Sequence, residues 1–185
     1  MPIRPRDVKT LLSEKQLYDG VQRMASQISE LYGDKPVTIV GVLTGCVVLL
    51  TDLIRQLDMP LRIDFIQASS YRGETSRGRL KINPDLMPDI AGRDVLLVDD
   101  IFDTGHTLVQ VVEELRKLEP QSIHTAVLLR KEGRQEVDFE PNFVAFQIPD
   151  GFVIGYGLDY RDEYRNLPYL AALEPADIRE PEAIG

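Results

Sequence analysis

Apolar residues near the start of the chain recur at the spacing of an α-helix. The steps between them are four, three, four and three residues, and the positions are Leu17, Val21, Met24, Ile28 and Leu31. This spacing places all of them on one helix face. Ser13 with Gln16 fits a capping box at the start, and Gly33 fits a C-terminal stop. The pattern predicts an amphipathic helix over residues 13–32.

Continuous apolar runs rich in β-branched residues follow, and they are typical of buried strands. Strands are predicted at residues 37–43, 61–71, 94–100, 123–130, 143–149 and 152–160. A helix is expected over about 47–57, and another from about residue 107, marked by Leu108, Val111, Val112, Leu115 and Leu118. Strand–helix alternation predicts an α/β fold with a mostly parallel sheet flanked by helices. Residues 163–175 look partly helical at best, and residues 176–185 look like a loose tail.

The polar stretch at residues 72–93 interrupts this alternation. It carries three Gly, two Pro and many charges. A long, weakly patterned segment inside a compact domain is usually a functional flap or a disordered excursion. We therefore expect a mobile loop here.

Composition narrows the class of protein. The 185 residues suit a single domain, and a net charge of −9 argues against nonspecific binding of nucleic acid. Cys46 is the only cysteine, which excludes an intrachain disulfide, and we expect it to be a buried apolar residue. The start of the chain has no signal-peptide core, and the longest apolar region, residues 37–50, is too short for a membrane span. No membrane partner and a cytoplasmic location are expected.

The sequence VLLVDDIFDTGHTL, residues 95–108, holds the densest candidate chemistry. Ligands of open α/β sheets bind beyond the carboxyl ends of the strands, and residues 99–107 are predicted to form such a loop. Thr104 and Thr107 offer hydroxyl groups, Gly105 lets backbone amides approach a ligand, and the following helix begins there. These features predict a phosphate cradle without the lysine of a P-loop.

Three acids precede or begin this cradle and would repel a phosphate. Asp99 and Asp100 should therefore face sugar hydroxyls or a divalent cation bound with the phosphate. The alternative is structural: Asp103 caps the helix and the acid pair only solvates a strand end.

The same motif resembles the phosphoribosyl-pyrophosphate motif of type I phosphoribosyltransferases. Residues 37–165 resemble the hypoxanthine/guanine phosphoribosyltransferase family, and FVAFQIPDGFVIGYGLDYRDEYRNLP, residues 143–168, is a second family-like block. The resemblance implies a type I phosphoribosyltransferase fold over residues 1–185, with a small hood region. Adenine-type relatives usually carry an apolar residue where Asp103 stands, and pyrimidine-operon regulators carry Tyr.

The resemblance implies roles around phosphoribosyl pyrophosphate. Asp99 and Asp100 match the acids that receive the ribose 2′- and 3′-hydroxyls. The 5′-phosphate loop corresponds to Asp103, Thr104, Gly105, His106 and Thr107, with His106 at a variable, solvent-facing position. Asp103 also matches the general base near purine N7, because removal of a ring proton makes N9 electron-rich enough to attack the sugar.

The resemblance also assigns the purine and pyrophosphate contacts. Lys131 matches the lysine that donates to the 6-oxo group, Phe152 stacks on the purine, and the Val153 backbone reads its exocyclic edge. Asp159 lies near the purine and Mg²⁺, with Asp99 and Asp100 as further metal candidates, and Arg165 holds pyrophosphate. The structural alternatives are a solvated lysine, a core aromatic and a surface ion pair.

Two loops complete the implied site. Leu43, Thr44 and Gly45 match the pyrophosphate loop, in which backbone amides and an unusual peptide geometry are typical. Many relatives carry Lys where this chain has Thr44, so only the backbone role of Gly45 is carried over. Ser70 and Tyr71 match the Ser-Tyr pair of a mobile loop, expected here at about residues 70–93, that closes over the site and excludes water.

Together these features imply Mg²⁺-dependent transfer of 5-phosphoribosyl to N9 of hypoxanthine, and of guanine, in purine salvage. A xanthine-preferring transferase is one alternative, and an RNA-binding regulator on the same fold is another. The net charge of −9 and the aspartate at position 103 count against the regulator. The family implies small-molecule substrates and a homodimer or homotetramer.

Overall fold

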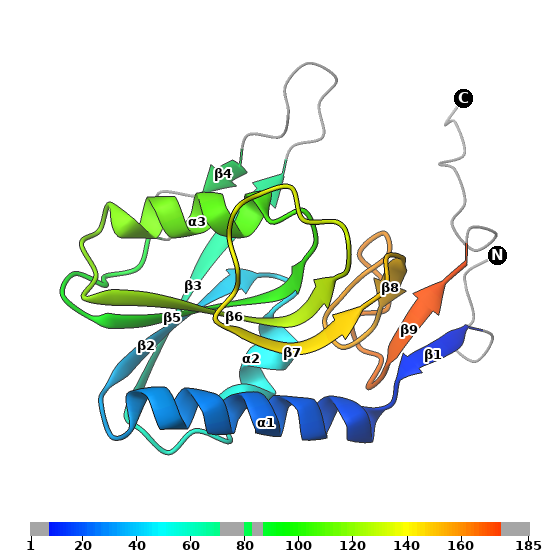
Figure 1. Cartoon of the computed structure of the whole chain (residues 1–185), viewed down its shortest axis with the longest axis horizontal. Coiled ribbons are helices and arrows are strands. Elements are labelled where there is room, and N and C mark those ends of the chain that lie inside the picture. The colour runs from blue at the N-terminus through cyan, green and yellow to red at the C-terminus, as the bar shows by residue number, and fades with distance from the viewer. Residues whose placement is uncertain (1–7, 71–79, 83–86, 175–185) are drawn as a thin grey trace.

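The computed structural model describes residues 8–70, 80–82 and 87–174. A six-stranded sheet in the order β4-β3-β2-β5-β6-β7 forms its centre (Figure 1). Its strands are β2 (Val37–Leu43), β3 (Leu61–Ser70), β4 (Leu80–Ile82), β5 (Asp94–Phe102), β6 (Ser122–Lys131) and β7 (Phe143–Ile148). All neighbours pair in parallel except β4, which runs antiparallel to β3. The predicted α/β fold is confirmed.

Helices cover both faces of this sheet. Helices α1 (Glu14–Tyr32) and α2 (Val47–Ile54) lie on one face, and α3 (His106–Arg116) lies on the other (Figure 1). Successive strand residues point to opposite faces, so Ile39 packs into the core under α1 and α2 while Val40 packs into the core under α3. Burial on both faces explains why the central strands β2, β5 and β6 contain continuous apolar runs.

The ends of the first two helices follow from local chemistry. The backbone N–H of Gln16 donates to Ser13 Oγ and the Gln16 side chain accepts from the Ser13 N–H, so the predicted capping box is present. Gly33, at φ 57°, ends the helix. Helix α2 ends at Ile54, three residues before its predicted end, because a turn at Gln56 directs the chain into β3.

Strand β5 continues further than the sequence suggested. Its parallel pairing with β6 extends through Asp99, Ile101 and Phe102. The strand predicted over residues 94–100 thus extends two residues further, and the loop predicted over residues 99–107 is wrong in its first four residues, which all lie within β5. Only the turn from Asp103 to Gly105 separates β5 from α3.

A second sheet forms the hood at one end of the molecule. It consists of β1 (Lys9–Leu12), β9 (Leu170–Leu173) and β8 (Phe152–Ile154) in the order β1-β9-β8, all antiparallel. The partly helical interpretation of residues 163–175 is wrong, since β9 lies there. The strand predicted over residues 152–160 ends at Ile154, because Gly155, Tyr156 and Gly157 have φ values of 95°, 49° and 99°.

The polar stretch contains more structure than predicted. Strand β4 lies within it, and Ile90, only 1% exposed, packs into the core under α3. The mobile loop predicted over about residues 70–93 therefore extends too far toward its C-terminal end. Tyr71 lies outside the described residues, as does the predicted tail. Across the parts of the chain that the structure describes, no helix is long and apolar enough to cross a membrane.

Candidate active site

Two adjacent acidic residues, Asp99 and Asp100, lie near the C-terminal end of β5 in the candidate site. Asp99 is 6% exposed, and its Oδ1 accepts the N–H of Asp100 at 2.9 Å. The Asp100 Oδ1 accepts the N–H of Ile101 at 2.8 Å. Burial, with the charge of Asp100, holds the pKa of Asp99 well above its usual range. Burial also raises the pKa of Asp100, although the hydrogen bonds that it accepts and the Arg165 charge oppose this rise.

The third acid lies where β5 turns into α3. Lys131 Nζ is 3.0 Å from Asp103 Oδ2, and Arg134 Nε is 3.1 Å from Asp103 Oδ1. Partial burial would raise the pKa of Asp103, but the hydrogen bonds and charges of Lys131 and Arg134 lower it below its ordinary value. Asp103 is therefore an anion that two cations hold in place.

The predicted phosphate cradle is formed by the turn into α3. Gly105 has φ 90°, and a Cβ there would lie 2.4 Å from Val137 and 2.7 Å from the Phe102 ring. The N-cap residue Gly105 makes no side-chain capping hydrogen bond, and binding of phosphate by the amides of the first turn stays a prediction. His106 is 54% exposed, as expected, and its Nε2 lies 2.9 Å from Glu136 Oε2. Its contact with phosphate stays a prediction.

The predicted pyrophosphate loop packs tightly against the acids. The peptide bond between Leu43 and Thr44 is cis, which is the unusual geometry expected there. A Cβ on Gly45 would lie 1.6 Å from Asp100 Oδ2, and one on Gly157 would lie 2.2 Å from the Gly45 carbonyl oxygen. Gly45 is thus enclosed between β5 and the turn after β8, and Thr44 is exposed.

A Gly45→Ala substitution is expected to damage the site and the fold together, because its methyl group would overlap the Asp100 carboxylate. We expect a loss of about 1–3 kcal/mol in unfolding free energy, the usual cost of overpacking. Binding of phosphoribosyl pyrophosphate should weaken at least tenfold. Thermal melting and ligand titration measure both effects. Gly151→Ala is the matched control, because a Cβ there meets nothing within 4 Å. A stable, fully binding Gly45→Ala protein would contradict the expectation.

The hood contributes the remaining predicted residues. Phe152 is 39% exposed at the start of β8, and its ring packs edge-on against Tyr160 at 5.5 Å, whereas Val153 is buried. Arg165 Nη2 pairs with Asp159 Oδ1 at 2.8 Å, and its Nη1 donates to the Gly157 carbonyl at 2.8 Å. The ion pair considered as the structural alternative for Asp159 and Arg165 is therefore present, and Arg165 also binds the turn that contacts the pyrophosphate loop. The roles of these two residues toward Mg²⁺ and pyrophosphate stay predictions.

Comparisons with known proteins agree with this geometry. The sequence model of the phosphoribosyl transferase domain matches residues 7–161. The hypoxanthine-guanine phosphoribosyltransferase of Staphylococcus epidermidis is 44% identical over 171 residues, covering 91% of this chain and 96% of that protein. The Staphylococcus aureus protein of the same name is 41% identical over 168 residues, covering 90% of this chain and 94% of that protein. The chain belongs to the hypoxanthine-guanine phosphoribosyltransferase family.

Solved structures of this family share the fold. A hypoxanthine-guanine phosphoribosyltransferase from Bacillus anthracis superposes with a TM-score of 0.86 at 38% identity, covering 91% of this chain and all of that one. A hypoxanthine phosphoribosyltransferase from Staphylococcus aureus gives a TM-score of 0.88 at 38% identity, covering 95% of this chain and 96% of that one. The phosphoribosyltransferase predicted from residues 95–108 is confirmed at the level of fold and family.

Two charged residues of this phosphoribosyltransferase site were missed from the sequence. Arg134 contacts Asp103, and Asp150 Oδ1 lies 3.7 Å from both Lys131 Nζ and Arg134 Nε. A search for charges just beyond the carboxyl ends of strands would have found both, since they follow β6 and β7. Among the described residues, no group of three or more His, Cys, Asp or Glu side chains converges on a point that could hold a metal ion.

Proposed function

We propose that this family member transfers the 5-phosphoribosyl group of phosphoribosyl pyrophosphate to N9 of hypoxanthine and of guanine. The observation that carries the proposal is the 3.0 Å contact between Lys131 Nζ and Asp103 Oδ2. It places a donor suited to a 6-oxo group beside a carboxylate suited to a ring N–H, so one purine edge can engage both. Arg134 and Lys131 favour the anionic form of Asp103, which is the form a general base requires.

The reaction breaks the bond between C1′ and the pyrophosphate oxygen and forms the bond between C1′ and N9. The electron pair of the broken bond leaves with pyrophosphate, and the ring proton of the purine passes to Asp103. Arg165 would lie beside the negatively charged pyrophosphate as it leaves. Asp99 and Asp100 would receive the ribose hydroxyls, and the first turn of α3 would bind the 5′-phosphate.

Discrimination between purines follows from Lys131. Its ammonium group has donors only, so it accepts an oxo group at C6 and opposes the amino group of adenine. Its side chain is 12% exposed, which limits the ability of water to compensate a mismatch. Phe152 offers stacking worth about 1–3 kcal/mol, which is nearly equal for different purines.

Mg²⁺ is part of the proposal, and the residues present fit it. Mg²⁺ usually binds one or two protein carboxylates and completes its octahedral shell with substrate oxygens and water. Asp99 with Asp100, or Asp159, would hold an ion that arrives with pyrophosphate. When bound, the ion would neutralise charge on the departing pyrophosphate.

A purine panel tests the proposed function. With phosphoribosyl pyrophosphate and Mg²⁺, we expect rapid turnover of hypoxanthine and guanine and slower turnover of xanthine. For adenine we expect kcat/KM to be about 5-fold to 150-fold lower, because an unmatched buried donor costs about 1–3 kcal/mol. Ultraviolet absorbance measures each rate, and chelation of Mg²⁺ should abolish turnover. Faster turnover of xanthine would favour the xanthine-preferring alternative. Tight, specific RNA binding without turnover would favour the regulator.

Assembly into a homodimer or homotetramer is also proposed. Tyr18 is 54% exposed and borders a cavity of about 790 Å³ between α1, α2 and residues 165–168. Val47, at the start of α2, is 39% exposed. The exposed Tyr18 ring beside this cavity supports the proposed contact between subunits. The cytoplasmic location remains a prediction.

A further inference from the structure

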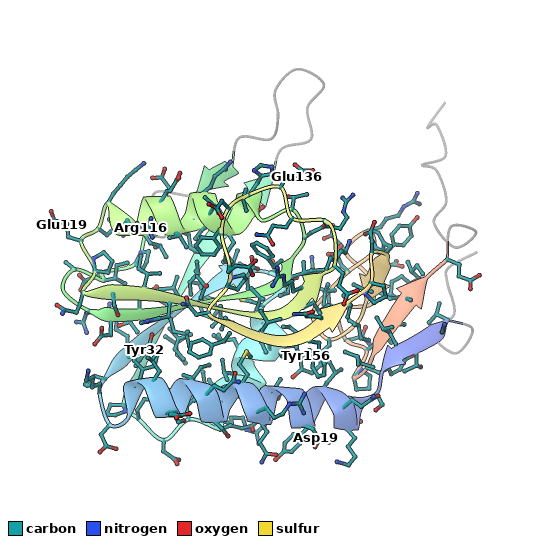
Figure 2. All side chains as sticks on the ribbon, in the orientation of Figure 1. Asp19, Tyr32, Arg116, Glu119, Glu136 and Tyr156 are labelled. Carbon is teal, nitrogen blue, oxygen red and sulfur yellow. The ribbon has the colours of Figure 1, made fainter. Side chains whose placement is uncertain are left out.

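The connection between β6 and β7 lies against the turn that begins α3. The backbone N–H of Glu136 donates to the Thr104 carbonyl at 3.0 Å, and Val137 fills the space in front of Gly105. The Gln135 side chain donates to two carbonyls of the same connection, at 2.9 Å each. In Figure 2, Glu136 lies in this connection near the N-terminal end of α3. These contacts fix the course of the connection without using Arg134.

The Arg134 side chain is therefore not needed to hold the connection in place, and it contacts Asp103 of the candidate site instead. Its Nε donates to Asp103 Oδ1 at 3.1 Å, while Lys131 Nζ contacts Asp103 Oδ2 at 3.0 Å. The two oxygens of one carboxylate are thus divided between two cations. Asp150 Oδ1, 3.7 Å from both cationic atoms, offers Lys131 a second anion on the solvent side.

The separate contacts of the two Asp103 oxygens affect catalysis only if Asp103 is the general base, so the inference rests on the proposed function. Lys131 must turn from Asp103 to the purine oxo group, which frees Oδ2 for the ring N–H. The carboxylate would then be free to rotate unless its other oxygen stayed bound. We propose that Arg134 is a positioning residue. It holds Oδ1 of Asp103, so that Oδ2 faces the purine when the Lys131 side chain turns from Asp103 to the purine oxo group.

The competing interpretation is an ordinary surface ion pair. The Arg134 and Asp103 side chains are 44% and 35% exposed, and such pairs contribute little to stability. A surface pair would leave the reaction unaffected, whereas a positioning residue changes the protonation and orientation of Asp103. The charged groups that face this pair are Lys131, Asp150, Glu136 and His106, and none of them donates to Oδ1.

Arg134→Gln tests the inference, with Arg134→Lys and Arg116→Gln beside it. Removal of the cation raises the pKa of Asp103, so the acid limb of the kcat/KM profile for hypoxanthine should move to higher pH, by about half a unit or more. At neutral pH, kcat should fall about tenfold with little change in KM for phosphoribosyl pyrophosphate, since orientation of the base is lost. Arg134→Lys should recover most of both changes.

Arg116→Gln is the matched control, because it removes the same charge from the far end of α3, where Arg116 is exposed (Figure 2). Its pH profile should equal that of the unmodified protein. An unchanged profile for Arg134→Gln, or no recovery by Arg134→Lys, would overturn the inference.

A second measurement separates this inference from the proposed function. Carboxyl ¹³C NMR reads the pKa of Asp103 without turnover, and Asp103→Asn identifies its resonance. If the purine panel fails but Arg134→Gln still raises this pKa, the contact is real and the proposed function is wrong. If the panel succeeds and the pKa does not move, the role of Arg134 is wrong. Melting curves confirm that each variant is folded.

Discussion

Asp103→Asn is expected to reduce kcat for hypoxanthine by about 100-fold to 10,000-fold, the range usual for loss of a general acid–base group. The amide has nearly the same shape but cannot accept the purine proton. Lys131 and Arg134 lose an anionic partner, yet Asp150 lies 3.7 Å from both and keeps them paired. We therefore expect the variant to fold and to bind phosphoribosyl pyrophosphate with an affinity within about fivefold of the original, because the lost pair with the exposed Arg134 contributes only ~0–1 kcal/mol and Lys131 keeps Asp150 as an anionic partner.

Steady-state rates and ligand titration measure these two quantities separately. Asp138→Asn is the matched control, since Asp138 is an exposed aspartate of the same β6–β7 connection. It should retain the original rate and affinity. If Asp103→Asn turned over hypoxanthine at the original rate, Asp103 would have no part in the proton transfer. A large loss of phosphoribosyl-pyrophosphate binding would instead indicate that Asp103 supports the phosphate loop.

The central sheet could be predicted because its signals are local. The central strands β2, β5 and β6 are buried on both faces along most of their length, so each reads as an apolar run. Helix α1 carries both its apolar spacing and its cap in the sequence. Two of the three hood strands, β1 and β9, have no such signal. Strands β1 and β9 have four residues each and pair across most of the chain, with Thr10 opposite Ala171. Short strands stabilised by distant partners have no periodicity from which to predict them.

Only part of the candidate site could be predicted, because some of its residues follow a local sequence signal and others are placed by contacts between distant segments. Asp99, Asp100 and Asp103 follow an apolar run and were visible at once, but their division between strand and turn depends on pairing with β6. Arg134 could have been named as a charge that follows β6, but its contact with Asp103 could not be predicted because Arg134 lies in an irregular connection. Its position depends on contacts of its neighbours with Thr104 and Gly105, which no spacing in the sequence reveals.

Asp99→Asn is expected to make the protein more stable and less able to bind its substrate. Burial and the charge of Asp100 raise the pKa of Asp99 in the folded state. A carboxyl group with a raised folded-state pKa favours folding at low pH, and this contribution is lost as pH rises through that pKa. Asparagine does not titrate, and its oxygen can still accept the Asp100 N–H that Asp99 accepts at 2.9 Å. The variant therefore keeps the hydrogen bond and avoids the buried charge.

The expected gain at neutral pH is about 1.4 kcal/mol for each unit by which the folded-state pKa is raised. For a domain of this size, each kcal/mol corresponds to a rise of about 2–4 °C in Tm. Loss of a charged acceptor for a ribose hydroxyl should weaken binding of phosphoribosyl pyrophosphate about tenfold or more, since such hydrogen bonds contribute about 1.5–3 kcal/mol. Calorimetry measures the Tm, and ligand titration measures the affinity.

Asp58→Asn, at an exposed position before β3, is the control and should change neither quantity. The difference in Tm between Asp99→Asn and the original protein should also shrink as pH falls, because protonation of Asp99 removes the charge that the substitution removes. A lower Tm at neutral pH would show that the Asp99 charge is stabilised by its surroundings. In that case the buried Asp99–Asp100 pair would stabilise the folded state, and the residues that bind ribose would not lower the stability of the protein.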